Sequence, residues 1–423
     1  MNSAKLKEKI KNNASEILGT LYSDPTRQSQ RILSAIETFE QKYGTCRDIA
    51  VFSTPGRSEI IGNHTDHNNG CVIASAIDRD IIAVAAKNEL NTVRFLSEGY
   101  EENIIGLDKI ASPDNFEKYT SSALIGGVAR AFTESGLLIG GFDAYSTTEV
   151  LKGSGLSSSA AFEVMVGNIF SHLYNGGAVE NSTLAKFARY AENEYFGKPC
   201  GLMDQMACAV GGFVYIDFED KASPAVEKID FSMDKVGYKL CIVNTGGNHA
   251  DLNEDYASVT KEMRGVAQMF GKEVLRGITL SDIIEKSAEI RSVHGDRALL
   301  RAVHFVVENE RVAEAKAALT GGEISDFFNA LTESGRSSFE YLQNVYTNKN
   351  PKEQGISLAL MLTDVFGGAA SYRVHGGGFA GTMQAFVPGS KAGEYTEYME
   401  KVFGKGAVMN LSVRSVGACK IID

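Results

Sequence analysis

The strongest constraint on the fold is a series of strand-like runs between residues 49 and 97. The runs IAVFST, GCVIASAI, DIIAVAAK and NTVRFLS are rich in valine and isoleucine, and glycine, asparagine or aspartate bounds them. Helical patterns follow in blocks rather than in regular alternation with strands, which predicts an α+β fold and not a doubly wound parallel sheet. Before the strands, residues 3–43 predict one or two amphipathic helices broken at Asp24-Pro25.

The length predicts two domains. A chain of 423 residues is long for a single hydrophobic core. The strand-like run YKLCIVNTG, near residues 238–246, opens the second domain, so we expect domains over 1–235 and 236–423. The second contains several helical patterns and SYRVHGGGFAGTMQAFV, which predicts a glycine-rich turn between two strands.

Charge and cysteine usage limit the partners and the compartment. The net charge of −11 supplies no basic excess for nucleic acid or an anionic membrane. No apolar run reaches the length of a membrane span, and the polar start MNSAKLKEKIKNN lacks the apolar stretch of a secretory signal. The six cysteines form no CxxC pair, which indicates neither a disulfide framework nor a zinc ribbon. We therefore expect a reduced, cytoplasmic protein that is a monomer or a homodimer.

A glycine-serine loop, LKGSGLSSSAAFEV at residues 151–164, runs directly into an apolar helical pattern. Small residues let the backbone close on a ligand, and the unpaired N–H groups of a first helical turn favour negative charge. The loop is thus a candidate phosphate site, with serine hydroxyls available for phosphate or a metal ion. The alternative is a flexible turn with a serine N-cap.

Two familiar phosphate-binding motifs do not apply. The chain has no GxxxxGK[ST] sequence. The segment GGGFAG at 376–381 matches GxGxxG, but the following TMQAFV alternates like a strand where a dinucleotide fingerprint requires a helix. This segment therefore predicts a tight turn whose backbone lies close to a ligand or to a neighbouring strand.

Acidic residues stand out in ENEYFGKPCGLMDQMACAV, residues 192–210. Asp204 lies among apolar neighbours, where a carboxylate needs a partner or its pKa rises, as in a general base. The alternative is a helix N-cap. Arg57 is a candidate partner, because a paired arginine keeps an aspartate ionised and can contact a phosphoryl oxygen.

The stretch PGRSEIIGNHTDHNNG, residues 55–70, concentrates short polar side chains beside an apolar run. Asn63, His64, Thr65 and Asp66 are consecutive, which suits several hydroxyls of a sugar ring. A metal site fits less well, since HTDH lacks the four-residue histidine spacing of a helical zinc site and no cysteine is near.

Three stretches together resemble one family. PGRSEIIGNHTDHNNG resembles the galactokinase signature, usually PGRVNLIGEHTDYNxG, KGSGLSSSAAFEV resembles the phosphate loop of GHMP small-molecule kinases, and VHGGGFAGTMQAFV resembles their third, glycine-rich motif. Their order agrees with galactokinases, and the resemblance runs from about residue 40 to the C-terminus. It implies a two-domain α+β fold with the active site in the interdomain cleft, and ATP-dependent phosphorylation of the anomeric hydroxyl of a sugar with Mg²⁺.

The resemblance also implies roles for particular residues. Asp204 matches the catalytic aspartate and Arg57 the arginine beside it. The metal-binding positions match Ser159 and Glu194. The loop over the triphosphate matches Gly153, Ser154, Gly155, Leu156, Ser157 and Ser158. The sugar-contacting positions match Asn63, His64, Asp66, Gly201 and Tyr256.

Departures from the signature bear on the substrate. Asn63 stands where galactokinases have a glutamate that contacts the C6 hydroxyl, His67 replaces a tyrosine, and Glu59 replaces an asparagine. The late family motif SHxSL corresponds to SGRSSF here. An amide donates as well as accepts, so Asn63 is expected to remove a negative charge that faces C6.

Three readings of Asn63 stay open. Galactose binds with the amide in place of the carboxylate; a sugar altered at C6, such as galacturonate, is preferred; or other residues offset the change. A different class of function is a catalytically silent sugar sensor with this fold. The intact GLSSSAA together with Arg57, Glu194 and Asp204 favours the enzyme.

Overall fold

The structure is a computed structural model that describes residues 1–150, 155–247 and 252–422. It mixes helices and sheets as predicted for an α+β protein. The chain divides into two compact units, and their sequence segments interleave. The first unit takes residues 1–57, 76–212 and 414–423, and the second takes 58–75 and 213–413. The expected division into 1–235 and 236–423 stays a prediction about domains.

The first unit is built on a sheet with strand order β12-β1-β2-β5-β3-β4. Strand β3 runs parallel to β5, while β2 is antiparallel to β5 and β4 is antiparallel to β3. The strands span β1 Ala50–Ile61, β2 Cys71–Lys87, β3 Thr92–Ser97, β4 Asn103–Gly106, β5 Phe142–Thr148 and β12 Cys419–Ile422. Strand β1 is long and contains the PGRSEII stretch. A strand tolerates a proline at its edge or at an irregularity.

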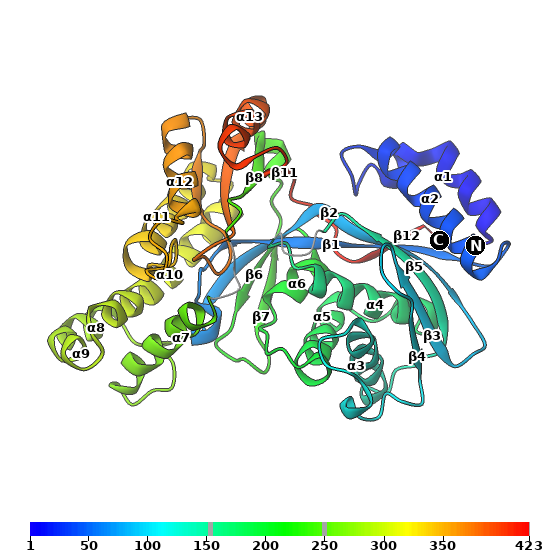
Figure 1. The fold of residues 1–423 in the computed structure, drawn as a ribbon, viewed down its shortest axis with the longest axis horizontal. Helices are drawn as coiled ribbons and strands as arrows, with labels where there is room; N and C mark the ends of the chain where they lie inside the picture. The colour runs from blue at the N-terminus through cyan, green and yellow to red at the C-terminus, as the bar shows by residue number, and fades with distance from the viewer. Residues whose placement is uncertain (151–154, 248–251, 423) are drawn as a thin grey trace. The chain divides into compact units, whose positions relative to one another are not determined.

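Helices cover both faces of this sheet (Figure 1). Helices α1 Ser3–Leu18 and α2 Pro25–Tyr43 lie on one face, where Ile32, Ile36 and Phe39 pack against Val51 and Val84. On the other face lie α3 Ser121–Glu134, α4 Ser158–Tyr174, α5 Asn181–Tyr190, the π-helix η3 Ala191–Phe196 and α6 Met203–Val210. The single-turn η2 Pro113–Asn115 precedes α3.

The predicted break between the first two helices is confirmed. Helix α1 spans Ser3–Leu18 and α2 spans Pro25–Tyr43. The Asp24 side chain accepts a hydrogen bond from the backbone N–H of Arg27, and Pro25 occupies the first turn. Aspartate at the N-cap and proline at the first helical position are the residues that such a start favours.

The second unit contains an antiparallel sheet with strand order β11-β8-β10-β9. Its strands are β8 Tyr238–Asn244, β9 Ser371–Val374, β10 Thr382–Pro388 and β11 Val408–Leu411, and a further pair is β6 Phe213–Asp217 with β7 Ala225–Ile229. Its helices are α7 Asn253–Gln268, α8 Leu280–Glu285, α9 Ser287–His294, α10 Asp296–Gly321, α11 Ile324–Ser337, α12 Gly355–Phe366 and α13 Ala392–Phe403. Short turns of helix are η1 Asp66–Asn68, η4 Met233–Val236, η5 Ser338–Leu342 and η6 Gly389–Lys391.

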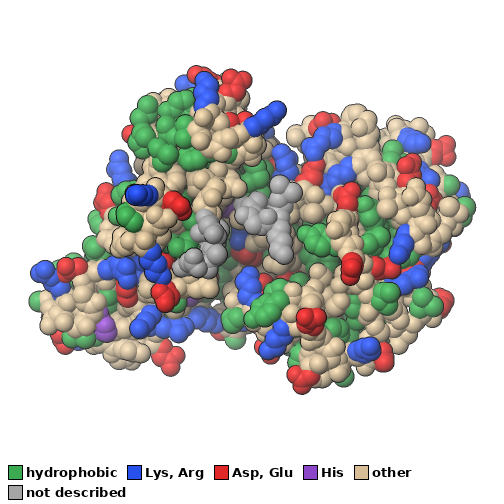
Figure 2. Space-filling model, in the orientation of Figure 1, with side chains coloured by type: hydrophobic (Ala, Val, Ile, Leu, Met, Phe, Trp, Pro, Cys, Tyr) green, Lys and Arg blue, Asp and Glu red, His purple; other side chains and the backbone are tan. Residues whose placement is uncertain are grey.

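Helix α12 carries apolar residues on its outer side as well as toward the sheet. Ile356 and Ala359 are buried, whereas Leu358, Met361 and Val365 are exposed. Figure 2 shows hydrophobic side chains gathered over this helix. Within the described ranges, no helix combines the length and the apolar character needed to cross a bilayer.

Candidate active site

Arg57 and Asp204 form a two-pronged ion pair in the first unit. The guanidinium Nε of Arg57 lies 2.7 Å from Oδ1 of Asp204, and its Nη2 lies 2.7 Å from Oδ2. Arg57 comes from β1 and Asp204 from the first turn of α6. Two parallel charge-assisted hydrogen bonds fix the carboxylate in orientation as well as in charge. The predicted partnership of these two residues is therefore present in the structure.

The phosphate-loop segment contacts the same pair. The Ser157 hydroxyl donates to Oδ2 of Asp204, and Nη1 of Arg57 donates to the carbonyl oxygen of Gly155 at 2.5 Å. Ser157 has a φ of +56°, a left-handed conformation that costs energy for a non-glycine residue and is found at functional sites. The predicted loop residues Gly153 and Ser154 lie outside the described residues.

Glycine at position 56 allows this close approach. A Cβ atom there would lie 2.9 Å from the carbonyl oxygen of Leu156 and 2.9 Å from a methyl group of Val150. The backbone N–H of Arg57 donates to the same Leu156 carbonyl at 3.1 Å. The Pro-Gly-Arg sequence thus lets β1 run directly against the loop and present Arg57 to it.

Helix α4 begins immediately after Ser157, as the sequence predicts. Its N-cap residue, Ser157, makes no side-chain capping bond, because the hydroxyl is committed to Asp204. The first N–H groups of this 17-residue helix therefore keep the capacity to bind an anion. Ser158 and Ser159 add hydroxyls in the first turn.

The electrostatics keep Asp204 ionised. Burial raises the pKa of Asp204, but the charge of Arg57 and the hydrogen bonds from Arg57 and Ser157 outweigh it, so that the pKa lies below its usual value. The side chain keeps 32% of its surface exposed, against 12% for Arg57. The carboxylate is thus a partly accessible anion of low basicity, and the elevated pKa of an unpaired general base does not arise here.

Two buried glutamates, Glu163 on α4 and Glu192 on η3, lie near this ion pair. Oε2 of Glu192 accepts from Nε2 of Gln205 at 2.7 Å, and Oε1 accepts from Nζ of Lys198 at 3.1 Å. The same Gln205 nitrogen lies 3.4 Å from Oε2 of Glu163. Burial raises the pKa of Glu163 well above its usual value, and the charge of Glu192 adds to this effect. Burial and the neighbouring charge of Glu192 therefore both favour the protonated form of Glu163.

The two predicted metal residues differ in placement. Ser159 lies in the first turn of α4, whereas Glu194 is exposed on η3. Glu192, two residues earlier, is the glutamate that the π-helix turns inward. Oε1 of Glu163 and Oε1 of Gln205 are buried and have no hydrogen-bond partner within the described residues. Hydroxyl and carboxylate oxygens suit Mg²⁺, so a set that contains Ser159 and Glu192 fits this ion by chemistry.

No cluster of three or more histidine, cysteine, aspartate or glutamate residues that could hold a metal by itself occurs in the described part of the chain. A Mg²⁺ ion commonly uses one or two carboxylates together with water and substrate phosphates. The residues of the first unit fit that mode and not an all-protein cage.

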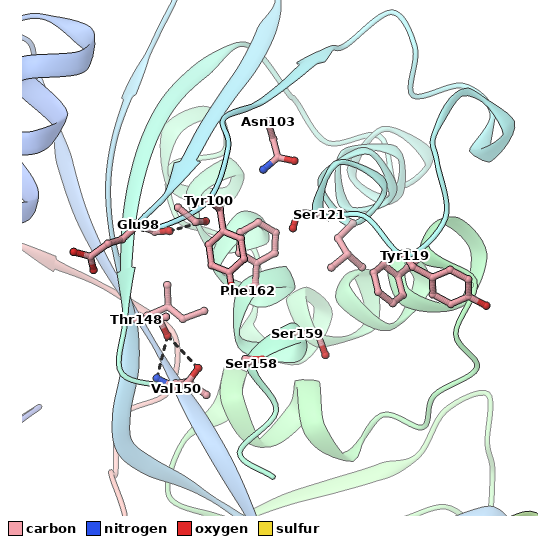
Figure 3. A pocket seen from close by; sticks show the side chains of 15 residues that line it. Glu98, Tyr100, Asn103, Tyr119, Ser121, Thr148, Val150, Ser158, Ser159 and Phe162 are labelled. Atoms are coloured by element: carbon pink, nitrogen blue, oxygen red, sulfur yellow. Dashed lines mark hydrogen bonds between the residues drawn. The ribbon is translucent and has the colours of Figure 1, made fainter. Parts of the chain in front are cut away.

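A pocket of about 230 Å³ opens beside the start of α4. Figure 3 shows Tyr100, Phe162 and Tyr119 around it, with Ser158 and Ser159 at the first turn of the helix. Its volume falls just below the range of about 300–1,000 Å³ typical of drug-sized ligands. A flat ring between aromatic side chains suits this space. No sequence pattern predicts the pocket, because its lining comes from six separate segments.

The signature segment 59–70 lies in the second unit. After β1 the chain turns at Gly62, where a Cβ would lie 2.6 Å from the carbonyl oxygen of Cys71. The Thr65 hydroxyl donates to the carbonyls of Gly62 at 2.9 Å and Cys71 at 2.7 Å, which closes the loop. His64 adopts a φ of +59° within it. A strained residue held by a closed loop is typical of a binding site.

Three of the predicted sugar-contacting side chains each bind one carbonyl of the third motif. Nδ2 of Asn63 donates to Gly376 at 2.7 Å, Nε2 of His64 to Gly377 at 2.9 Å, and the Tyr256 hydroxyl to Gly378 at 2.8 Å. The predicted tight turn between two strands is confirmed, because these glycines lie between β9 and β10. Asp66 begins the turn η1 and is half-buried.

His67 contacts other side chains of the loop. Because Nε2 of His64 donates to a carbonyl, Nδ1 of His64 accepts from Nε2 of His67 at 3.2 Å, and Nδ1 of His67 accepts from Asn68 at 3.0 Å. Desolvation lowers the pKa of His67 to about 3, and the neighbouring His64 adds to the effect. His67 is therefore neutral at physiological pH.

The polar interior of the second unit continues behind Asn63. The Asn63 carbonyl accepts from Nε2 of His304 at 3.0 Å, and Nδ1 of His304 accepts from the Ser337 hydroxyl at 2.8 Å. Oε1 of Glu308 accepts from the backbone N–H of Gly62 at 3.1 Å and from the Ser334 hydroxyl at 2.5 Å. The divergent SGRSSF segment thus supplies serines to this network.

The remaining predicted sugar residue is Gly201, which belongs to the first unit. It is exposed and precedes α6 by two residues. The described residues predicted for catalysis and phosphate binding are therefore in the first unit, and Asn63, His64, Asp66 and Tyr256 are in the second.

Family models of known proteins match the regions that contain the signature segment and the phosphate loop. The family model described as galactokinase galactose-binding signature matches residues 37–87, and that of the GHMP kinases N terminal domain matches residues 123–212. A galactokinase of Glaesserella parasuis is 31% identical and covers 84% of this chain and 88% of its own length. A galactokinase of Mannheimia succiniciproducens is 31% identical, covering 85% and 90%.

Solved structures agree on the fold. The Lactococcus lactis galactokinase complexed with galactose has a TM-score of 0.76 at 23% identity and covers 92% of this chain and 100% of its own. The Methanococcus jannaschii mevalonate kinase has a TM-score of 0.60 at 15% identity, with 86% and 98% covered.

Proposed function

This chain belongs to the galactokinase family, and we propose that it transfers the γ-phosphoryl group of ATP to the anomeric hydroxyl of galactose. The products are galactose 1-phosphate and ADP. The observation that carries the proposal is the Arg57–Asp204 ion pair, held against the Ser157 end of the phosphate loop.

The chemistry follows from that arrangement. The anomeric oxygen forms a bond to the γ-phosphorus while the bond from this phosphorus to the β-bridging oxygen breaks and ADP leaves with the electron pair. Such transfers depend mainly on alignment and charge neutralisation, so a weakly basic carboxylate is sufficient. Asp204 orients the hydroxyl and accepts its proton late in the transfer, and Arg57 stabilises the charge on the phosphoryl oxygens.

The first unit supplies the groups for the nucleotide. We assign the base to the aromatic pocket around Tyr100, Phe162 and Tyr119, and the phosphates to the first turn of α4. Mg²⁺ when bound would neutralise phosphate charge. Ser159 and Glu192 would hold it, with Glu192 in place of the exposed Glu194. His64, Asp66, Gly201 and Tyr256 are the proposed sugar-contacting residues.

The test is ADP release by the purified protein with Mg-ATP and a panel of free sugars. The panel holds galactose, glucose, galacturonate, glucuronate and N-acetylgalactosamine, and Asp204→Asn is the matched control because it keeps size and removes the charge. We expect turnover with galactose that falls about 10²–10⁴-fold in the variant. Absence of sugar-dependent ADP release from the folded wild-type protein would overturn the proposal.

A further inference from the structure

The Asn63 side chain has no hydrogen-bonding capacity left for a sugar. Its Nδ2 carries two hydrogens, and it donates to Oε1 of Glu59 at 3.0 Å and to the carbonyl of Gly376 at 2.7 Å. Its Oδ1 accepts from Nδ2 of Asn344 at 2.7 Å and lies 3.5 Å from the Ser338 hydroxyl. Asn63 is fully buried. It is therefore a positioning residue that joins Glu59 to the glycine-rich turn.

Glu59 is the more exposed member of this pair, although it is itself largely buried. Its Oε1 accepts from Asn63 and lies 3.5 Å from Nη1 of Arg373, and 9% of the side chain remains exposed. Its second oxygen, Oε2, accepts no hydrogen bond from the described residues. This oxygen is not fully buried, so it can accept a hydrogen bond from a ligand. Arg373 is wholly buried, so its own unpartnered nitrogens, Nε and Nη2, are closed to a ligand.

The departures from the signature at Glu59 and Asn63 are best understood together, as an exchange of an asparagine and a glutamate between two positions. The signature PGRVNLIGEHTDYNxG has asparagine where this chain has Glu59 and glutamate where it has Asn63. The side chains at these positions are in direct contact here. A carboxylate is therefore present four residues before the position where the signature has one, and it is in contact with Asn63.

We propose that Glu59, oriented by Asn63 and neutralised from behind by Arg373, is the residue that selects the sugar by accepting a hydrogen bond from one of its hydroxyls. This inference rests on the proposed function and deepens it. A carboxylate accepts and cannot donate, and it repels a second carboxylate. The preferred substrate is therefore a neutral hexose with that hydroxyl intact, and a uronic acid is rejected.

The exchange is tested by a mutant cycle on the full chain. The variants are Glu59→Asn, Asn63→Glu and the double exchange, which restores the signature. Asn63→Glu alone places two carboxylates in contact, and Glu59→Asn alone leaves buried Arg373 without this ion pair. We expect both single variants to unfold at lower urea concentration and the double variant to recover most of the loss. Additive losses in the double variant would overturn the pairing.

Selectivity is tested with Glu59→Gln, which keeps the size and removes the charge. Kinetics with galactose, each of its monodeoxy analogues and galacturonate separate binding from turnover. We expect the KM for galactose to rise at least tenfold with a smaller change in kcat, and one deoxy analogue to show no further rise. Galacturonate should gain relative to galactose. An unchanged KM and an unchanged order of the sugars would overturn the role of Glu59.

The two proposals fail in different ways. If the wild-type protein releases no ADP with any sugar, the proposed function fails, while the unfolding cycle still reports on the exchange. If the wild-type protein phosphorylates galactose and the Glu59→Gln variant does so with the same KM, only the inference on selectivity fails. The conservative variant Glu59→Asp should rescue part of the KM, because it restores the charge.

Discussion

The pair Arg57–Asp204 and the cluster around Asn63 use polar side chains in opposite ways. Asp204 keeps 32% of its side chain exposed and retains access for a ligand, although Arg57 and Ser157 already bind it. Asn63 and His304 are fully buried, and all their polar atoms have partners within the second unit. The first arrangement presents charge, and the second fixes the shape of a loop and of the glycine-rich turn.

This difference shows that residues for catalysis and residues for sugar selection are recognised in the sequence in different ways. Each reactive group in the first unit can be recognised by its own position in a motif. The selective residue in the second unit can be recognised only as one member of a contacting pair, because Asn63 donates directly to Glu59. Substitutions that separate the two arrangements should therefore have effects of different kinds.

Among the substitutions that separate these two arrangements, Arg57→Ala is expected to have the largest effect. Removing the guanidinium takes away both a charge that stabilises the transferring phosphoryl group and the partner of Asp204, so turnover should fall about 10²–10³-fold. Burial then dominates, and the pKa of Asp204 should rise from below its usual value to above it. The acid limb of the kcat profile should move to higher pH, as measured between pH 4 and 8.

Arg57→Lys is the control for this prediction. Lysine keeps the charge but cannot make two parallel hydrogen bonds to the carboxylate. The acid limb should stay near its wild-type position while turnover still decreases. If the profile of Arg57→Ala coincides with that of the wild-type protein, Arg57 does not set the ionisation of Asp204.

Sequence alone was sufficient for the parts that local pattern determines. The α+β class, the helix break at Asp24-Pro25 and the turn between β9 and β10 followed from periodicity and turn residues. The Arg57–Asp204 contact followed from motif resemblance and charge. In each case a short segment, or a pair of familiar segments, contains the whole signal.

Other features depended on contacts between distant segments. The inward turn of Glu192 follows from a π-helix, whose extra residue per turn cannot be read from periodicity. The aromatic pocket gathers residues from β2 to η3, which share no pattern. In the sequence, Glu59 and Asn63 are two separate departures from the signature, because their contact forms only in the folded chain.

The second prediction concerns acid stability and the buried network of the second unit. Burial lowers the pKa of His304 to about 4. The unfolded chain therefore binds more protons between pH 6.5 and 4, and the free energy of unfolding should fall in that window by up to roughly 3 kcal/mol from this residue. Urea unfolding at pH 7, 6, 5 and 4.5 measures the decrease.

His304→Gln isolates this contribution, since glutamine can donate to the Asn63 carbonyl but does not titrate. The variant should start less stable at pH 7 and lose less stability on acidification. His67, whose pKa is also lowered, should leave a residual slope. The same pH dependence in both proteins would mean that His304 does not remain neutral in the folded state.

A third prediction separates the two glutamates of η3. Glu192→Gln removes a buried carboxylate oxygen and should raise the Mg²⁺ concentration for half-maximal turnover about 10–100-fold. Glu194→Gln changes an exposed side chain on the same helix and should leave it within about twofold, as surface changes usually do. Titration of activity with Mg²⁺ at fixed ATP gives both values, and the reverse order would return the metal role to Glu194.

The smallest effect is expected in the aromatic pocket. Tyr119 is exposed at its rim and contacts Phe196 edge-on, with 5.4 Å between the ring centroids. Stacking of a base on one aromatic ring contributes about 1–3 kcal/mol, and an exposed ring lies at the low end. Tyr119→Ala should therefore raise the KM for ATP about five- to tenfold with kcat and the KM for galactose unchanged. Tyr119→Phe keeps the ring and should behave as the wild-type protein. A rise in the KM for galactose instead of ATP would place the sugar, and not the base, in this pocket, and the division of chemistry between the two regions would have to be redrawn.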